Sequence, residues 1–198
     1  MKFLLTSTGF SNSKIKDKFC ELMAKPINQV KVAFIPTASR TAEELKYVNI
    51  SKNELIGLGV KKSNIFVFDL KRKIDLDEFS DIDVIYVCGG NTFYLMKMIR
   101  ESGFDMVMNA LSKKNMLYVG VSAGSIIVGP NIEIARPFDE NDVQLTDFTG
   151  LKLVDIVVSP HYVTEDESLI KPFVEKFNVV RITDEEAVLV DKTVTIIS

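Results

Sequence analysis

The sequence predicts an α/β fold in which helices cover both faces of a mostly parallel sheet. Short β-rich apolar runs alternate with longer stretches of helical periodicity, and the runs are apolar on both faces. Strands buried beneath helices on either side of a parallel sheet have this pattern. The end of the chain differs: residues 187–190 and 194–197 are apolar and only three residues apart, which predicts an antiparallel hairpin.

Five apolar runs are the expected parallel strands: residues 3–5, 30–35, 65–68, 84–87 and 117–121. Two stretches between them, residues 41–58 and 92–100, carry apolar residues at helical spacing and are the expected crossover helices. Gly57 and Gly59 would end the first, and Gly103 would supply a left-handed cap after the second. Residues 130–149 are polar and weakly periodic, so we expect a long excursion from the sheet, of a kind that is often functional.

Composition excludes several classes of protein. The 198 residues predict a single domain spanning residues 1–198, and 46% hydrophobic with 26% charged residues indicates a globular chain. With Lys+Arg 24 against Asp+Glu 27 and no basic stripe, nucleic acid is not an expected partner. Two cysteines, Cys20 and Cys88, are too few for a disulfide framework or a zinc site, so we expect neither a metal nor a cofactor. No apolar run is long enough for a membrane span or a signal-peptide core, which predicts a cytoplasmic protein without membrane contact.

A candidate nucleophile, Ser122, lies in residues 120–124, Gly-Val-Ser-Ala-Gly, between an expected strand and the apolar residues 126–128. A G-x-S-x-G nucleophile elbow needs this context, because the serine occupies a strained turn where bulky neighbours would clash. A glycine-rich strand-to-helix turn without catalytic function has the same pattern. The motif alone leaves both interpretations open.

A second glycine turn, at Gly89 and Gly90, also follows an expected strand and leads into a helix. It is either a tight turn alone or, with the backbone N–H of Ala123, a source of hydrogen-bond donors for an oxyanion. It does not match the dinucleotide fingerprint G-x-G-x-x-G.

His161 is the only histidine, and it follows the apolar residues 154–158. It therefore lies after an expected strand, where the active sites of parallel sheets gather. Three acidic residues, 184–186, follow the strand-like residues 179–182, and one of them is the expected partner that orients the imidazole. A solvated turn describes at least two of these three.

Four motifs in this order resemble peptidase family S51, the dipeptidase E and cyanophycinase-like group, whose fold is similar to that of class I glutamine amidotransferases. They are residues 34–38, 89–93, 120–124 and 159–162. The resemblance implies a serine peptidase in which Ser122 is the nucleophile, His161 the general base and then acid, and Gly90 and Ala123 the oxyanion-hole donors. It points to Asp184 as the third catalytic residue, with Glu185 open.

The expected substrate is a small peptide, with Asn91 and Arg136 as candidate substrate-binding residues. The aspartyl dipeptidases of this family have an Asn-Asp-Met-Pro-like segment after the nucleophile and an arginine-rich segment after the histidine. This chain has residues 136–139, Arg-Pro-Phe-Asp, and no arginine between His161 and Arg181. We therefore expect little or no preference for an N-terminal aspartate. A hydrolase of other amides or esters and a non-catalytic binding module stay open as alternatives, as does formation of a homo-oligomer.

Overall fold

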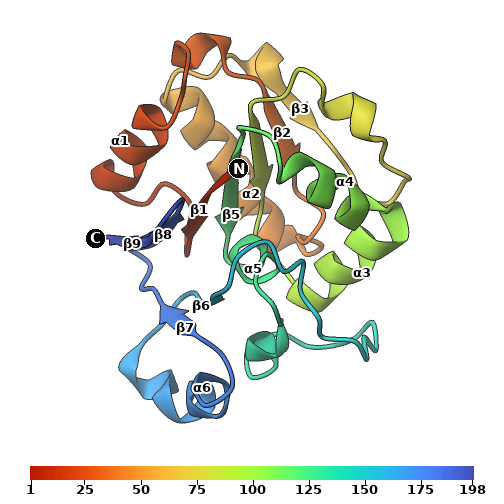
Figure 1. Ribbon diagram of the computed structural model, residues 1–198, viewed down its shortest axis with the longest axis vertical. Coiled ribbons are helices and arrows are strands. Elements are labelled where there is room, and N and C mark those ends of the chain that lie inside the picture. The colour runs from red at the N-terminus through yellow and green to blue at the C-terminus, as the bar shows by residue number, and fades with distance from the viewer.

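A seven-stranded sheet forms the centre of the computed structural model, which describes residues 1–198 (Figure 1). The strand order is β3-β2-β4-β5-β1-β8-β9. The strands are β1 (Lys2–Thr6), β2 (Val32–Ile35), β3 (Ile65–Val67), β4 (Val84–Val87), β5 (Leu117–Val121), β8 (Ala187–Val190) and β9 (Val194–Ile197). The first five are parallel and β8 and β9 are antiparallel, which confirms the predicted sheet and its C-terminal hairpin.

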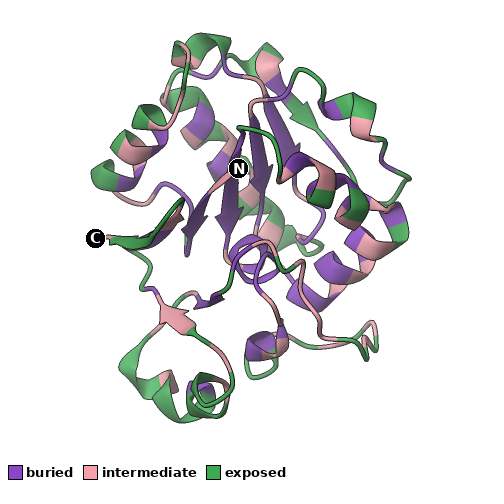
Figure 2. Cartoon of the chain, in the orientation of Figure 1, coloured by how far each residue is buried: buried purple, intermediate pink, exposed green.

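Helices pack on both faces of this sheet, because successive side chains of a strand point to opposite sides. In β4, Tyr86 packs in the core beneath α1 (Ser13–Glu21) and α2 (Ala42–Gly57), whereas Ile85 and Val87 pack in the core on the other face. That second core is covered by α3 (Thr92–Ser102), α4 (Phe104–Leu111) and α5 (Ala123–Ile126). The central strands are accordingly buried along their length (Figure 2).

Capping residues fix the two helices that the sequence predicts. Helix α2 begins with a capping box, in which Thr41 and Glu44 each bond the other's backbone N–H. Helix α3 is preceded by its N-cap Asn91, whose side chain accepts from the N–H of Tyr94, and is followed by its C-cap Gly103, which has the expected left-handed conformation with φ of 79°. The short 3-10 helices are Ile27–Gln29, Lys62–Asn64, Leu76–Phe79, Glu133–Ala135 and Thr164–Asp166.

A second, two-stranded sheet lies below the main one in Figure 1 and is formed by β6 (Val157–Ser159) and β7 (Val179–Arg181), with α6 (Glu167–Val174) between them. The strand expected at residues 154–158 is therefore shorter and lies outside the main sheet, because β8 occupies the edge of β1. None of the helices combines the length and the apolar character that a membrane span requires.

Residues 130–149 form the expected excursion, with no helix longer than the turn at Glu133–Ala135. A single bridge between Asn131 and Thr149 closes its base. Ile132 and Ile134 are fully or almost fully buried, so the excursion packs against the core and is not a free loop.

Candidate active site

Ser122 lies on a strained turn directly after β5. Its φ of 48° and ψ of −109° are rarely adopted by residues with a side chain, and such strain marks a candidate functional site. The flanking glycines allow the turn: a Cβ on Gly120 would lie 2.5 Å from the carbonyl oxygen of Gly124, and one on Gly124 would lie 2.4 Å from that of Val87. The G-x-S-x-G pattern is therefore required by close backbone packing.

Hydrogen bonds to β1 hold this turn in place. The N–H of Ser122 donates to the carbonyl of Thr6 at 3.0 Å. The buried Ser125 hydroxyl lies 2.8 Å from the same carbonyl and 2.9 Å from that of Gly120. The Tyr118 hydroxyl donates to the carbonyl of Gly124 at 2.7 Å. The position of the Ser122 side chain is thus set by the rigid centre of the sheet.

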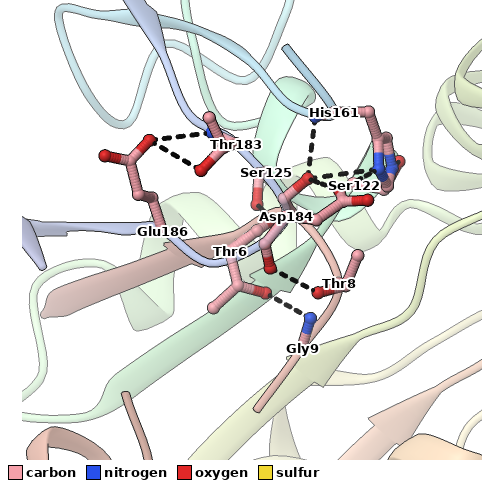
Figure 3. Close-up of polar contacts among 10 residues, drawn as sticks. Thr6, Thr8, Gly9, Ser122, Ser125, His161, Thr183, Asp184 and Glu186 are labelled. Carbon is pink, nitrogen blue, oxygen red and sulfur yellow. Dashed lines mark hydrogen bonds and ion pairs between the residues drawn. The ribbon is translucent and has the colours of Figure 1, made fainter. Parts of the chain in front are cut away.

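The side chains of Ser122, His161 and Asp184 form a continuous hydrogen-bonded chain (Figure 3). Nε2 of His161 lies 2.9 Å from Oγ of Ser122, and Nδ1 lies 2.7 Å from Oδ1 of Asp184. His161 also has a positive φ, of 56°. An imidazole between a hydroxyl and a carboxylate is the arrangement by which a serine nucleophile is activated.

The two neighbouring acids lie elsewhere. Glu186 accepts from the backbone N–H and the hydroxyl of Thr183 at 2.9 and 3.0 Å. Glu185 lines a separate surface groove with Lys14. Of the three acidic residues, Asp184 is the one whose carboxylate bonds the imidazole.

Ser7, which follows β1, also takes part in these hydrogen bonds, and no sequence motif indicates it. Its hydroxyl donates to Oδ1 of Asp184 at 2.8 Å and accepts from the backbone N–H of His161 at 2.7 Å. It also lies 3.2 Å from Nδ1 of His161. Because Ser7 is fully buried, its hydroxyl is a fixed bridge between the two loops that carry the histidine and the acid.

The second glycine turn lies against Ser122. A Cβ on Gly89 would be 3.1 Å from Cβ of Ser122. Gly90 has a φ of 132°, and a Cβ there would be 2.3 Å from the carbonyl oxygen of Ala38, so only glycine fits. The N–H of Gly90 donates no hydrogen bond to the protein, which leaves this donor available to a ligand.

Two pockets meet at Ser122 and His161. The smaller has a volume of about 130 Å³ and includes Asp139 and Asp166 among apolar side chains. The larger, of about 550 Å³, is lined by residues that include Tyr47 and Gly89. Neither pocket is lined by lysine or arginine.

The two candidate substrate-binding residues line neither pocket. The side chain of Asn91 caps α3 and donates to the carbonyl of Glu140 at 2.7 Å, so it holds residues 138–142 to the helix. Arg136 is exposed, pairs with Glu133 at 3.5 Å and covers the ring of Phe148 at 4.4 Å. The structure thus brings five of the seven predicted residues to one site and leaves these two beside it.

Asp139 is a second residue of the site that sequence reasoning missed. It accepts from the N–H of Thr92 at 2.8 Å, at the start of α3. Burial raises the pKa of this carboxyl above its ordinary value, although the bond from Thr92 acts in the opposite direction. Asp139 lines the smaller pocket together with Ser122 and His161, and a carboxyl with a raised pKa in such a pocket is a candidate functional group.

The side chains give little support for a cysteine nucleophile or a bound metal ion at this site. Burial raises the pKa of the Cys88 thiol well above its ordinary value, so this residue, which lines the larger pocket, stays protonated and is a poor nucleophile. No group of three or more histidine, cysteine, aspartate or glutamate side chains is arranged to hold a metal ion.

Comparisons with known proteins find similar sequences among peptidases. The model of peptidase family S51 matches residues 3–197. An uncharacterized peptidase of Pasteurella multocida is 30% identical, over 100% of this chain and 97% of its own length. Peptidase E of Salmonella typhimurium is 33% identical over 71% of this chain, a match that spans 59% of that protein.

Solved structures show the same fold. A crystal structure of a Listeria monocytogenes protein assigned to peptidase E has a TM-score of 0.80 and 30% identity, covering 98% of this chain and 96% of that one. A peptidase from an acI-B1 Actinobacterium, 14% identical, has a TM-score of 0.60 over 96% of this chain and 82% of its own, and shows a likeness of fold alone.

Proposed function

The chain belongs to peptidase family S51, and from that membership we propose that it is a serine peptidase that hydrolyses short peptides through an acyl-enzyme on Ser122. One observation carries the proposal: the hydrogen-bonded chain from Ser122 through His161 to Asp184. The strained elbow beneath Ser122 supports it independently, since strain of this kind persists mainly where function requires it.

The proposed reaction uses each of these groups in turn. Nε2 of His161 takes the hydroxyl proton while Oγ of Ser122 attacks the peptide carbonyl. The N–H groups of Gly90 and Ala123 stabilise the oxyanion that forms. His161 then gives its proton to the leaving amine, and water, activated by the same imidazole, hydrolyses the ester. Asp184 keeps the imidazole oriented and stabilises its charged form.

We propose little preference for an N-terminal aspartate. Selecting a substrate carboxylate needs a fixed cation, best an arginine that contacts both oxygens. No lysine or arginine lines either pocket at Ser122, and Arg136 is engaged elsewhere. A hydrolase of non-peptide amides or esters would use the same catalytic groups, and a binding module would hold its ligand on the free N–H of Gly90 without turnover.

A fluorophosphonate probe tests the proposal, because it reacts with an activated serine. We expect the wild type to be labelled at Ser122 and to cleave dipeptides and tripeptides. Ser122→Ala should fold, escape labelling and lose roughly 10⁴- to 10⁶-fold in kcat. The matched control Ser168→Ala, on exposed α6, should behave as the wild type.

Three outcomes separate the alternatives. A wild type that takes no label and turns over nothing would be a binding module. Labelling with turnover of esters but of no peptide would favour the non-peptide hydrolase. Full activity in Ser122→Ala would refute the role of this serine.

A further inference from the structure

The larger pocket beside Ser122 is formed by one face of α2 and by the segment that follows β1. Four residues of α2 line it at positions i, i+3, i+4 and i+7: Glu44, Tyr47, Val48 and Ser51. Residues at this spacing lie on the same face of a helix, so they form one continuous wall. Residues 7, 8 and 11 contribute three hydroxyl side chains to the same pocket.

Glu44 gives this wall a negative charge that no side chain balances. Its Oε2 accepts the N–H groups of Arg40 and Thr41 at 2.7 and 2.6 Å, whereas its other oxygen accepts no hydrogen bond within the protein. Burial raises the pKa of this carboxyl, but the bonds from the two N–H groups outweigh burial and hold the pKa below its ordinary value, so Glu44 is charged at neutral pH. The guanidinium of Arg40 is engaged with Asp142 at 2.7 Å, and no lysine or arginine lines the pocket.

Hydroxyl groups in and behind the same pocket lack partners. The Ser11 hydroxyl is buried and unpartnered, as is the hydroxyl of Tyr86, and Ser51 is only 5% exposed. A Cβ on Gly9 would lie 3.1 Å from Oε2 of Glu54 and 3.3 Å from the Tyr86 hydroxyl. Oγ of Ser51 is 4.0 Å from the same point, so these three polar atoms converge. Because buried polar groups are normally hydrogen-bonded, unpartnered ones mark a place where a ligand can supply donors.

From these groups we propose that the larger pocket binds a lysine or arginine side chain from the leaving half of the peptide, with Glu44 as a specificity-determining residue. An ammonium or guanidinium group only donates hydrogen bonds and carries positive charge, which suits a free carboxylate oxygen and unpartnered hydroxyls. Its aliphatic stem would pack along Tyr47 and Val48, and a guanidinium can stack on the tyrosine ring. The inference rests on the proposed function and adds a class of substrate to it.

Two features assign the leaving half of the peptide to this pocket. Ser7 and Asp184, which hold the imidazole of His161, line the larger pocket and not the smaller one. The leaving amine takes its proton from that imidazole. The volumes of the two pockets are about 550 and 130 Å³, so the larger one has the room for a long side chain together with peptide backbone.

The same charges act against a free carboxylate at the end of a dipeptide. That group would meet Glu44 and Asp184 with no lysine or arginine beside it. Like charges brought close together in a partly desolvated site repel each other. We therefore expect peptides whose C-terminus is an amide to be better substrates than the corresponding free acids, and the assay below uses amides throughout.

The role of Glu44 in the helix must be separated from its role in the pocket. Its carboxylate completes the capping box of α2 with Thr41. Glu44→Gln keeps an oxygen for that box, because glutamine serves there as well as glutamate, and removes only the charge. The matched control is Glu43→Gln, since Glu43 is an exposed residue of the same helical turn and lines neither pocket.

The assay compares alanyl-arginine amide with alanyl-citrulline amide, because citrulline has the shape of arginine without its charge. For the wild type we expect kcat/KM to be at least ~10-fold higher with arginine. Glu44→Gln should lower kcat/KM for the arginine compound ~10-fold and leave both the citrulline compound and the rate of fluorophosphonate labelling within twofold. Damage to α2 would instead lower all three together. Glu43→Gln should keep the wild-type ratio.

Salt dependence gives a second readout that structural damage would not imitate. The attraction between Glu44 and a cationic side chain is screened by salt because the pocket is open to solvent. Raising NaCl from about 0.02 to about 0.5 M should reduce the wild-type preference for arginine severalfold. In Glu44→Gln the ratio of the two rates should not change with salt.

The outcomes distinguish the assignment of the pocket from the proposed function. Equal hydrolysis of the two amides by the wild type would overturn the assignment even if Glu44→Gln failed to fold, as would an unchanged ratio in a folded Glu44→Gln. A preference for arginyl-alanine amide over citrullyl-alanine amide, without one at the second position, would show that the pocket holds the other half of the peptide. Labelling of Ser122 without cleavage of any of these amides would also overturn the assignment. Absence of both labelling and peptide hydrolysis would overturn the proposed function itself.

Discussion

Removing the hydroxyl of Ser7 should slow catalysis without altering Ser122, the proposed nucleophile. In Ser7→Ala, Oδ1 of Asp184 loses the bond that it accepts at 2.8 Å and the backbone N–H of His161 loses its acceptor at 2.7 Å. The bond between Nδ1 of His161 and Asp184 remains. The variant therefore loosens the positions of the imidazole and its orienting acid, while Oγ of Ser122 and the free N–H of Gly90 stay as they are.

The size of the effect follows from these contacts. A hydrogen bond to a charged group contributes about 1.5–3 kcal/mol. The Asp184 side chain is 60% exposed, so water replaces part of the lost bond, and we take about 1–2 kcal/mol as the net loss. If that loss is felt in the transition state, kcat falls roughly 5- to 30-fold. The N–H of His161 loses its bond inside the protein, so the melting temperature should also fall by a few degrees.

A double-mutant cycle decides whether Ser7 acts through Asp184. The rate of fluorophosphonate labelling is measured for the wild type, Ser7→Ala, Asp184→Asn and the double variant, well below their melting temperatures. We expect Ser7→Ala to cost little once Asp184 is replaced, with a coupling of at least about 1 kcal/mol. Additive effects within about 0.5 kcal/mol would refute the positioning role. Thr8→Val, which removes a bond to the Asp184 backbone carbonyl, should cost less than threefold.

Three further predictions follow from the geometry of the site. Asp184→Asn should lower kcat roughly 10³- to 10⁴-fold and Glu185→Gln less than twofold, measured on one dipeptide; the reverse order would mean that a different acid orients the imidazole. Gly90→Ala should lower the free energy of unfolding by about 1–3 kcal/mol from its backbone conformation alone, whereas Gly57→Ala, whose Cβ meets no atom within 4 Å, should change it by less than about 1 kcal/mol. The kcat/KM for Asp-Leu should be within ~10-fold of that for Ala-Leu, and Arg136→Ala should leave the ratio unchanged, because no lysine or arginine lines the pockets. A preference for Asp-Leu of ~100-fold or more would refute this expectation.

The sheet could be predicted from the sequence because its strands are buried on both faces. Runs such as residues 84–87 and 117–121 are apolar at every position, and both are fully buried strands in the structure. Residues 154–158 are apolar except for the exposed Asp155, and the strand there is shorter and belongs to the second sheet. An apolar run shows only that its residues are buried. Whether residues 154–158 could pair with β1 depends on β8, which takes that place and is nearly thirty residues further along the chain.

The hydrogen-bonded chain was accessible from the sequence because each member lies next to a recognisable element. Ser122 has its glycine motif, His161 is the only histidine, and the acids 184–186 follow a strand, among which the resemblance to family S51 points to Asp184. Ser7 and Asp139 have no such signal. Ser7 lies 154 residues from His161 in the chain, and Asp139 lies in a weakly periodic segment, so their places become apparent only when the chain is folded.

The residues of the proposed catalytic group and the residues that line the smaller pocket come from different parts of the fold. Ser7, Ser122 and the glycine turn follow β1, β5 and β4, whose hydrogen-bonded ladders fix them firmly. Asp139 and Phe138 come from the excursion at residues 130–149, which is held to α3 by Asn91 and Thr92. A change of sequence in the excursion alters the walls of the smaller pocket without moving the strand ends. Substrate preference in this protein can therefore vary while the arrangement at Ser122 is kept, which is why the preference must be inferred from the excursion and not from the G-x-S-x-G motif.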